Sequence, residues 1–303
     1  MTRRSLMASG AVALAHAAAT RMKIQLDCGS IGIKASLPQA VEYAARFGFE
    51  AVNADSAWLA AATAAERGEL LGRMQKAGLT WGQAGLPVEF RRGEEEFQRG
   101  LRALPERVAA LQQAGASRVT TWLPPASEDL TYVENFRLHV RRLRAAALVL
   151  EDHGCRLGLE YVGPKTSWTA RRFPFVHTMR EARELIAEIG RPNVGLVLDS
   201  WHWYTAGETA DDLRSLKASD VISIDLNDAP AGRSRDEQKD SERELPLATG
   251  VIPLADFLKT LNDIGCDAPA RCEPFNAALR AMPPEQALAT AAAAMKKAFA
   301  LIR

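Results

Sequence analysis

Four acidic residues stand in or directly after short apolar runs in the second half of the chain, and their type and order indicate metal chemistry. These residues are Glu160, Asp199, Asp225 and Glu273. A buried charge is costly without a partner, and hard divalent cations take oxygen ligands, so one shared ion would explain all four. For any single residue, pairing with an arginine or capping a helix is the simpler explanation. Four in succession favour a metal site.

The elements that must position these residues alternate along the chain from Met22 onward. Short apolar runs predict strands over residues 23–28, 51–54, 80–84, 118–122, 156–161, 194–199, 221–226 and 270–272. Amphipathic segments predict helices over 37–47, within 61–76, and over 94–113, 133–153, 179–189, 210–216, 254–264 and 285–302. Glycines such as Gly48, Gly154 and Gly190 follow several of these segments, where left-handed helix caps are expected.

Eight strand–helix units in succession predict an α/β fold with a parallel sheet. At this length they close a (β/α)8 TIM barrel, one domain over residues 22–303. A doubly wound open sheet is the alternative, but its GxGxxG turn is matched only poorly by residues 28–32. Barrel active sites lie at the C-terminal ends of the strands, where the four acidic residues are expected. The long segments 163–177 and 227–249 predict functional loops.

Near these strand ends the chain resembles the xylose isomerase-like TIM-barrel superfamily, the sugar phosphate isomerases and epimerases. The resemblance rests on Glu160, the Asp-x-x-His pattern from Asp199 to His202, the Asn-Asp-Ala-Pro turn at 227–230, and Glu273 followed by proline. It runs over roughly the whole chain after the first residues. It implies a divalent ion, Mn²⁺, Mg²⁺, Co²⁺ or Zn²⁺, bound by Glu160, Asp199, a seventh-strand residue and Glu273.

The resemblance also implies a reaction on a small-molecule sugar. Glu160 and Glu273 would act as acid and base on opposite faces of a ketose or keto-polyol, and His202 would hydrogen-bond a substrate oxygen. Removing a proton next to a carbonyl creates an enediolate, whose charge a cation stabilises. The expected protein is a divalent-metal-dependent isomerase or epimerase. A lyase of the inosose dehydratase kind, or a degenerate barrel that binds sugar without turnover, remains an alternative.

One position departs from the family pattern. Many relatives have a histidine in the seventh strand, where this chain has Asp225. If Asp225 ligates, the all-carboxylate site favours Mn²⁺ or Mg²⁺ over Zn²⁺. If its shorter side chain misses the ion, the site is weakened or empty. In the loop after this strand, Arg235 is the expected substrate-binding arginine. Candidates for an apolar wall on which a sugar ring could stack are Trp58, Trp122, Trp201 and Trp203.

Composition and charge limit the kinds of molecule that the protein is expected to bind. The net charge is +1, from 38 basic and 37 acidic residues, so no basic excess favours nucleic acid. The superfamily also includes apurinic endonucleases, which need a histidine-rich zinc cluster, and this chain has five histidines. The four cysteines lack the CxxC spacing of zinc-binding sites, and we expect them to be buried thiols. The sequence leaves open whether the chain forms a homo-oligomer.

The first residues are expected to lie outside the barrel. Arg3 and Arg4 precede a mild apolar run over 8–15 and two Ala-x-Ala sites, a pattern typical of a twin-arginine export signal. Residues 1–20 are therefore predicted as an export leader that directs the protein to the periplasm. A disordered start on a cytoplasmic enzyme is the alternative. The apolar run is too short to span a bilayer, so a stable membrane anchor is not expected.

Overall fold

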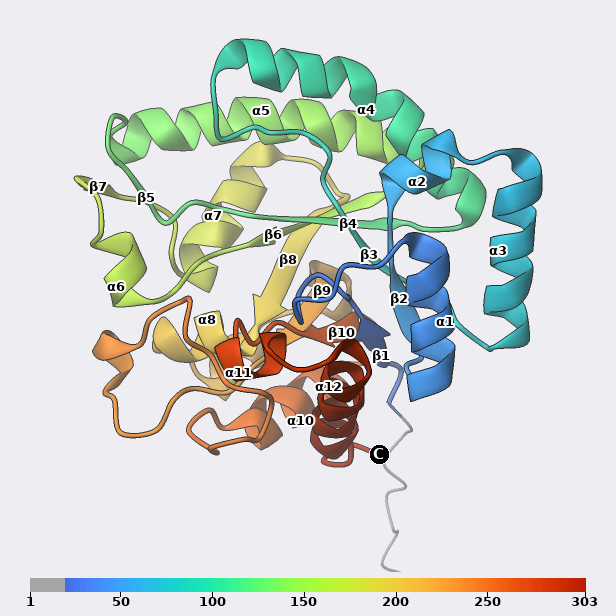
Figure 1. The fold of residues 1–303 in the computed structure, drawn as a ribbon. Helices are drawn as coiled ribbons and strands as arrows, with labels where there is room; N and C mark the ends of the chain where they lie inside the picture. Colours follow the sequence, from blue (N-terminus) through green and yellow to red (C-terminus); the bar gives the residue numbers. More distant parts are fainter. Residues whose placement is uncertain (1–19) are drawn as a thin grey trace, which may run out of the picture.

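Eight parallel strands close into a barrel in the computed structural model, which describes residues 20–303 (Figure 1). Around the barrel the strands follow the order β1, β2, β3, β4, β6, β8, β9 and β10, and β10 pairs with β1. Their bounds are β1 (Lys23–Leu26), β2 (Ala51–Ala54), β3 (Thr80–Gly85), β4 (Arg118–Trp122), β6 (Arg156–Glu160), β8 (Val194–Asp199), β9 (Val221–Leu226) and β10 (Pro269–Cys272). The predicted (β/α)8 barrel and all eight of its strands are confirmed.

Helices follow the strands and cover the outside of the barrel (Figure 1). The longer helices are α1 (Leu37–Phe47), α3 (Ala64–Lys76), α4 (Glu94–Ala114), α5 (Tyr132–Asp152), α7 (Met179–Ile189), α10 (Leu254–Asp263) and α12 (Pro284–Phe299). The shorter elements are α2 (Ser56–Ala61), β5 (Ala126–Ser127), α6 (Lys165–Trp168), β7 (Phe173–Pro174), α8 (Ser200–Thr205), α9 (Ala210–Arg214), η1 (Ala218–Asp220), η2 (Arg235–Glu237) and α11 (Ala277–Arg280). The predicted helices lie within a few residues of these bounds.

Local sequence signals fix the helix ends. Ser36 and Thr178 begin α1 and α7 with capping boxes, in which the hydroxyl and a side chain three residues later satisfy two free backbone N–H groups. Gly48 and Gly190 end the same two helices with φ of 74° and 66°, the left-handed conformation that glycine adopts without strain.

The barrel interior is shaped by the size of its side chains. A Cβ on Gly158 of β6 would lie 2.9 Å from side-chain atoms of both Val197 and Ile222. Real Cβ atoms do not approach so closely, so glycine lets the neighbouring strands pack together there. Below the strand ends, buried apolar side chains of strands and helices form one core. This rigid core holds the strand ends that carry the polar residues.

The predicted leader, residues 1–20, falls almost wholly on residues 1–19, which lie outside the described part of the chain. Within residues 20–303, no helix combines the length and apolar character needed to cross a membrane.

Candidate functional site

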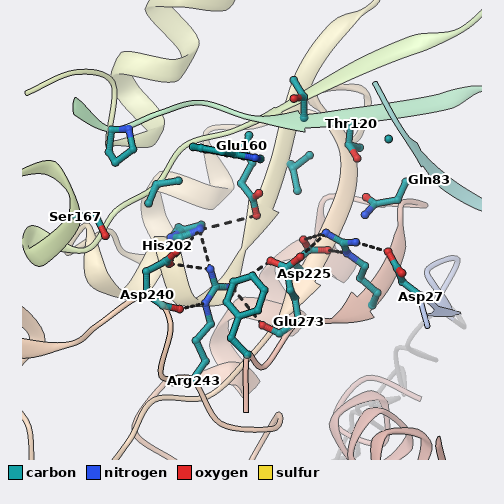
Figure 2. Close-up of a pocket in the computed structure, with 18 of the residues that line it drawn as sticks. Asp27, Gln83, Thr120, Glu160, Ser167, His202, Asp225, Asp240, Arg243 and Glu273 are labelled. Atoms are coloured by element: carbon teal, nitrogen blue, oxygen red, sulfur yellow. Dashed lines mark hydrogen bonds and ion pairs between the residues drawn. The ribbon is translucent and has the colours of Figure 1, made fainter. Parts of the chain in front are cut away.

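A cavity of about 580 Å³ lies where the barrel strands end, and side chains from across the barrel line it (Figure 2). Asp27 follows β1, Gln83 belongs to β3, Glu160 ends β6 and Glu273 follows β10. Polar groups from both halves of the barrel therefore meet in one space. This is the place that the sequence predicts for the site.

The structure brings all four predicted carboxylates together. Glu160, Asp199, Asp225 and Glu273 come from β6, β8, β9 and β10, four neighbouring strands of the barrel. Each offers one oxygen, and these four oxygens all lie within 4.8 Å of one another. The side chains of Asp199 and Asp225 are fully buried. Carboxylates packed this closely repel each other and require compensating positive charge.

Arg271 supplies part of that charge. It lies two residues before Glu273, so both side chains point to the same side of β10, into the barrel. Its Nε donates to Asp225 Oδ1 (2.8 Å), and its Nη2 donates to Asp225 Oδ2 (2.9 Å) and to Glu273 Oε1 (3.0 Å). Its Nη1 donates to Asp27 Oδ2. Asp225 is thus held at both oxygens by one guanidinium group.

Arg243 supplies the second buried positive charge, from the long loop between β9 and α10. Its Nη1 donates to Asp199 Oδ2 (2.7 Å) and lies 3.4 Å from Glu273 Oε2, and its Nη2 donates to Asp240 Oδ1 (2.8 Å). The guanidinium carbon lies 4.4 Å from the ring centre of Phe275, and the side chain is only 2% exposed. Figure 2 shows Arg243 reaching from its loop toward the carboxylates.

The negative charge still exceeds the positive charge. Six carboxylates lie around the two guanidinium groups and His202, those of Asp27, Glu160, Asp199, Asp225, Asp240 and Glu273. Burial, together with Asp225, Glu273 and Asp199, raises the pKa of Glu160 well above its ordinary value. Burial likewise raises the pKa of Asp199 to about 7, although Arg243 opposes this. Within the described chain, Oε1 of Glu160 is buried without a hydrogen-bond partner. An unpartnered carboxylate oxygen beside a surplus of carboxylates fits a divalent cation.

His202 lies on the first turn of α8, three residues after Asp199. The backbone N–H of Gly163 donates to its Nδ1 (3.2 Å), and Nη2 of Arg243, a group that can only donate, lies 3.4 Å from its Nε2. Burial lowers the pKa of His202 to about 3, so the ring is neutral. Nε2 lies 3.8 Å from Asp199 Oδ2 and 4.0 Å from Glu160 Oε1. His202 therefore lines the cavity as a neutral imidazole whose Nε2 lies among charged groups.

The Asn-Asp-Ala-Pro turn holds the site rather than lining it. The Nδ2 of Asn227 donates to Asp199 Oδ1 (2.9 Å), and its Oδ1 accepts from the backbone N–H of Glu273 (3.1 Å). Asp228 accepts from the backbone N–H groups of Thr249 (2.9 Å) and Gly250 (2.7 Å). The turn thus fixes the carboxylate of Asp199 and the backbone of Glu273, and it ties down the far end of the loop that carries Arg243.

Two expectations about side chains at the cavity need correction. The structure does not bring Arg235 to the cavity: its guanidinium lies over the ring of Tyr204, 5.1 Å from the ring centre. The arginine of the same loop that enters the site is Arg243. Of the four tryptophans, only Trp122 lines the cavity, where it is 47% exposed, whereas Trp201 and Trp203 are buried in the core.

Sequence reasoning missed both arginines, for different reasons. Arg271 interrupts a short apolar strand two residues before Glu273, so the period of two along a strand already places its charge beside that of Glu273. Arg243 lies in a long loop rich in charged residues, where nothing local distinguishes it from its solvated neighbours.

Behind the site, Glu208 is a partly buried carboxyl group that makes stability depend on pH. Its Oε1 accepts from the backbone N–H of Met179 (2.6 Å), and the hydroxyl of Tyr161 donates to its Oε2. Burial raises the pKa of Glu208 from 4.5 to about 7. Because the folded state holds this proton more tightly than the unfolded state, the stabilisation is complete below pH 4.5 and is lost as the pH rises through 7.

Glu208→Gln is therefore expected to abolish part of the pH dependence. Relative to this variant, the wild type should lose up to about 3 kcal/mol of unfolding free energy between pH 4.5 and 8. Urea unfolding across this range measures the difference, and Glu184→Gln on the exposed face of α7 is the control. Parallel pH profiles for the wild type and Glu208→Gln would contradict the assignment.

The chain matches known proteins over most of its length. A family model described as "Xylose isomerase-like TIM barrel" matches residues 41–298. A solved structure of a xylose isomerase domain protein from Alicyclobacillus acidocaldarius subsp. acidocaldarius is 33% identical. It covers 93% of this chain and 99% of that one, with a TM-score of 0.79.

More distant relatives share a segment or the fold. Inosose isomerase of Bacillus licheniformis is 30% identical over 147 residues, which cover 47% of this chain and 48% of that protein. The chain thus matches about half the length of this curated relative. A structure titled as IOLI protein with a binding zinc atom is 20% identical, covers 91% of this chain and 98% of that one, and has a TM-score of 0.75, a likeness of fold. With the family match and the 33% identical structure, the chain belongs to the xylose isomerase-like TIM barrel family.

Proposed function

We propose that this protein is a divalent-metal-dependent isomerase or epimerase that acts on a ketose or keto-polyol. The observation that carries this proposal is the convergence of four carboxylates from four neighbouring strands at the catalytic end of the barrel, where three of them line one cavity. The match to inosose isomerases over part of the chain supports a cyclic or open-chain polyol with a keto group as substrate.

Glu160, Asp199 and Glu273 would hold the metal ion, with Asp225 as the fourth ligand. An all-carboxylate site favours Mn²⁺ or Mg²⁺ over Zn²⁺, because no imidazole nitrogen takes part. Arg271 hydrogen-bonds both oxygens of Asp225, yet each carboxylate oxygen has a second lone pair for a cation. When bound, the ion would act as a Lewis acid on two substrate oxygens and stabilise the charge of an enediolate.

Glu160 and Glu273 would exchange the proton. They lie on β6 and after β10, with β8 and β9 between them, so a substrate carbon in the cavity would meet one carboxyl group on each side. Burial raises the pKa of both glutamates, but Arg271 donates to Glu273 and opposes this rise, whereas Oε1 of Glu160 has no such partner among the described residues. We therefore assign the first proton abstraction to Glu273 and the return of a proton on the other face to Glu160.

The remaining lining residues would orient the sugar. His202 lines the cavity and is placed to hydrogen-bond a substrate oxygen. Trp122 has one face of its ring covered by Arg91, whose guanidinium carbon lies 4.4 Å from the ring centre, and much of the ring remains exposed. Such a ring can pack against the C–H groups of a sugar.

Proton exchange in D₂O tests the reaction. Protein loaded with Mn²⁺ is incubated with inosose and with ketohexoses, and deuterium at the carbon next to the carbonyl is followed by NMR. Deuterium incorporation without loss of water, abolished by chelator, supports the isomerase or epimerase. A dehydrated product would favour the lyase instead. Sugar binding that is indifferent to chelator, with neither exchange nor turnover, would favour the non-catalytic barrel.

A further inference from the structure

Arg243 contacts the same oxygen atoms that a metal ion would use. Oδ1 of Asp199 already accepts hydrogen bonds from the backbone N–H of Trp201 (2.8 Å) and from Asn227 (2.9 Å). Oδ2 is therefore the Asp199 oxygen left for a further ligand, and it accepts from Nη1 of Arg243. The same Nη1 lies 3.4 Å from Oε2 of Glu273. One NH₂ group thus bridges two of the proposed ligands.

The two arginines of the site differ in how firmly they are held. Arg271 lies on a barrel strand and donates to three carboxylates, those of Asp27, Asp225 and Glu273. Arg243 lies on a loop, and its Nε and Nη2 donate to the backbone oxygen and side chain of Asp240, in the same loop. The bonds of Arg243 to Asp240 thus stay within its own loop, whereas every partner of Arg271 lies on or directly after a barrel strand.

We propose that Arg243 is an internal counter-ion that a divalent cation displaces from Asp199 and Glu273. The guanidinium neutralises part of the carboxylate charge in the metal-free protein, and it withdraws with Asp240 when the ion binds. This inference rests on the proposed metal site but not on the proposed reaction. It makes Arg243 a determinant of metal affinity: the ion binds only the fraction of molecules in which the guanidinium has left.

Removing the guanidinium should therefore tighten metal binding. If Arg243 occupies the carboxylates in nine of ten molecules, Arg243→Gln lowers the apparent Kd for Mn²⁺ by about tenfold. Mn²⁺ titrations followed by electron paramagnetic resonance of the free ion measure this Kd without any substrate. Arg233→Gln is the matched control, because it removes one positive charge from the same loop, where Arg233 pairs with Glu242. This control should change Kd by less than about twofold.

A rescue experiment separates displacement from simple charge repulsion. In Arg243→Ala, added guanidinium ion, well below denaturing concentrations, should raise the apparent Kd for Mn²⁺ competitively, and equal sodium chloride should not. The wild type should be unaffected by the guanidinium ion. In a crystal structure of the wild type with Mn²⁺, Nη1 of Arg243 should lie beyond hydrogen-bonding distance of Asp199.

The outcomes distinguish this inference from the proposed function. Equal or weaker Mn²⁺ binding by Arg243→Gln, or no competition by guanidinium, would overturn the displacement and leave the metal site intact. Absence of Mn²⁺ binding in both the wild type and the variant would overturn the metal site and the inference together. If Arg243→Gln does not fold, the crystal structure of the Mn²⁺-bound wild type still tests the proposal. Displacement is refuted if the guanidinium of Arg243 remains bonded to Asp199 in that structure.

Discussion

Replacing Glu273 with glutamine is expected to lower kcat for isomerisation by about 10²- to 10⁴-fold, the usual contribution of a positioned acid or base. Glutamine has nearly the same shape and can still accept a hydrogen bond from Arg271, so the barrel should remain folded. What is lost is a group that can take a proton. Because Glu273 is assigned the abstraction step, exchange of the substrate proton with D₂O should be lost together with turnover.

Glu160→Gln should separate the two halves of the reaction. Glu160 is assigned the return of the proton on the other face, so this variant should lose product formation but still exchange the substrate proton through Glu273. Both variants remove a proposed metal ligand, so rates must be compared at saturating Mn²⁺, with bound metal measured alongside. Glu237→Gln, on the exposed loop, is the control for loss of a carboxylate. Wild-type exchange in Glu273→Gln would refute the assignment of the base.

Much of the barrel and its catalytic face could be predicted from the sequence, because both depend on periodicity. Runs such as 194–199 and 221–226 are largely apolar, as expected for strands buried on both sides. In a parallel barrel all strands end on one side, so a carboxylate at the end of such a run must enter the same space. Strand identity therefore sufficed to bring Asp199 and Asp225 together.

The parts that could not be predicted depend on the path of loops. Arg235 and Arg243 stand eight residues apart in one charged loop, and only the folded path decides that Arg243 enters the cavity while Arg235 lies over Tyr204. The short helix α8 was also unpredicted, although it has a local cause: Asp199 caps it by accepting from the backbone N–H of Trp201. Six residues are too few for a helical period to be visible.

Arginine pairing and metal binding are both needed to explain how the buried carboxylates are neutralised. Asp225 is fully paired by Arg271, as expected if each carboxylate simply had an arginine partner. Glu160 has neither guanidinium within bonding distance, and its Oε1 lacks a partner within the described chain. The arginines thus account for one side of the carboxylate cluster and leave the Glu160 side for a cation.

The pair of Asp225 and Arg271 should contribute strongly to the stability of the folded protein. Arg271→Met is expected to lower the free energy of unfolding by about 3–5 kcal/mol, because removing one partner of a buried ion pair strands the other charge. Here the stranded carboxylate is that of Asp225, which is fully buried, and the carboxylates of Asp27 and Glu273 also lose a donor. Urea unfolding in the presence of chelator measures the loss, and Arg180→Met on the surface of α7 is the control.

A double variant identifies the cause of that loss. Adding Asp225→Asn to Arg271→Met removes the stranded charge, so part of the stability should return. The same proteins test Asp225 as a metal ligand: if it ligates, Mn²⁺ should stabilise Arg271→Met more than the double variant, and Asp225→Ala should bind less metal than the wild type. Unchanged metal content in Asp225→Ala would exclude Asp225 from the ligand set. Arg271→Met within about 1 kcal/mol of the wild type would mean that the pair is not the main compensation for the buried charge of Asp225.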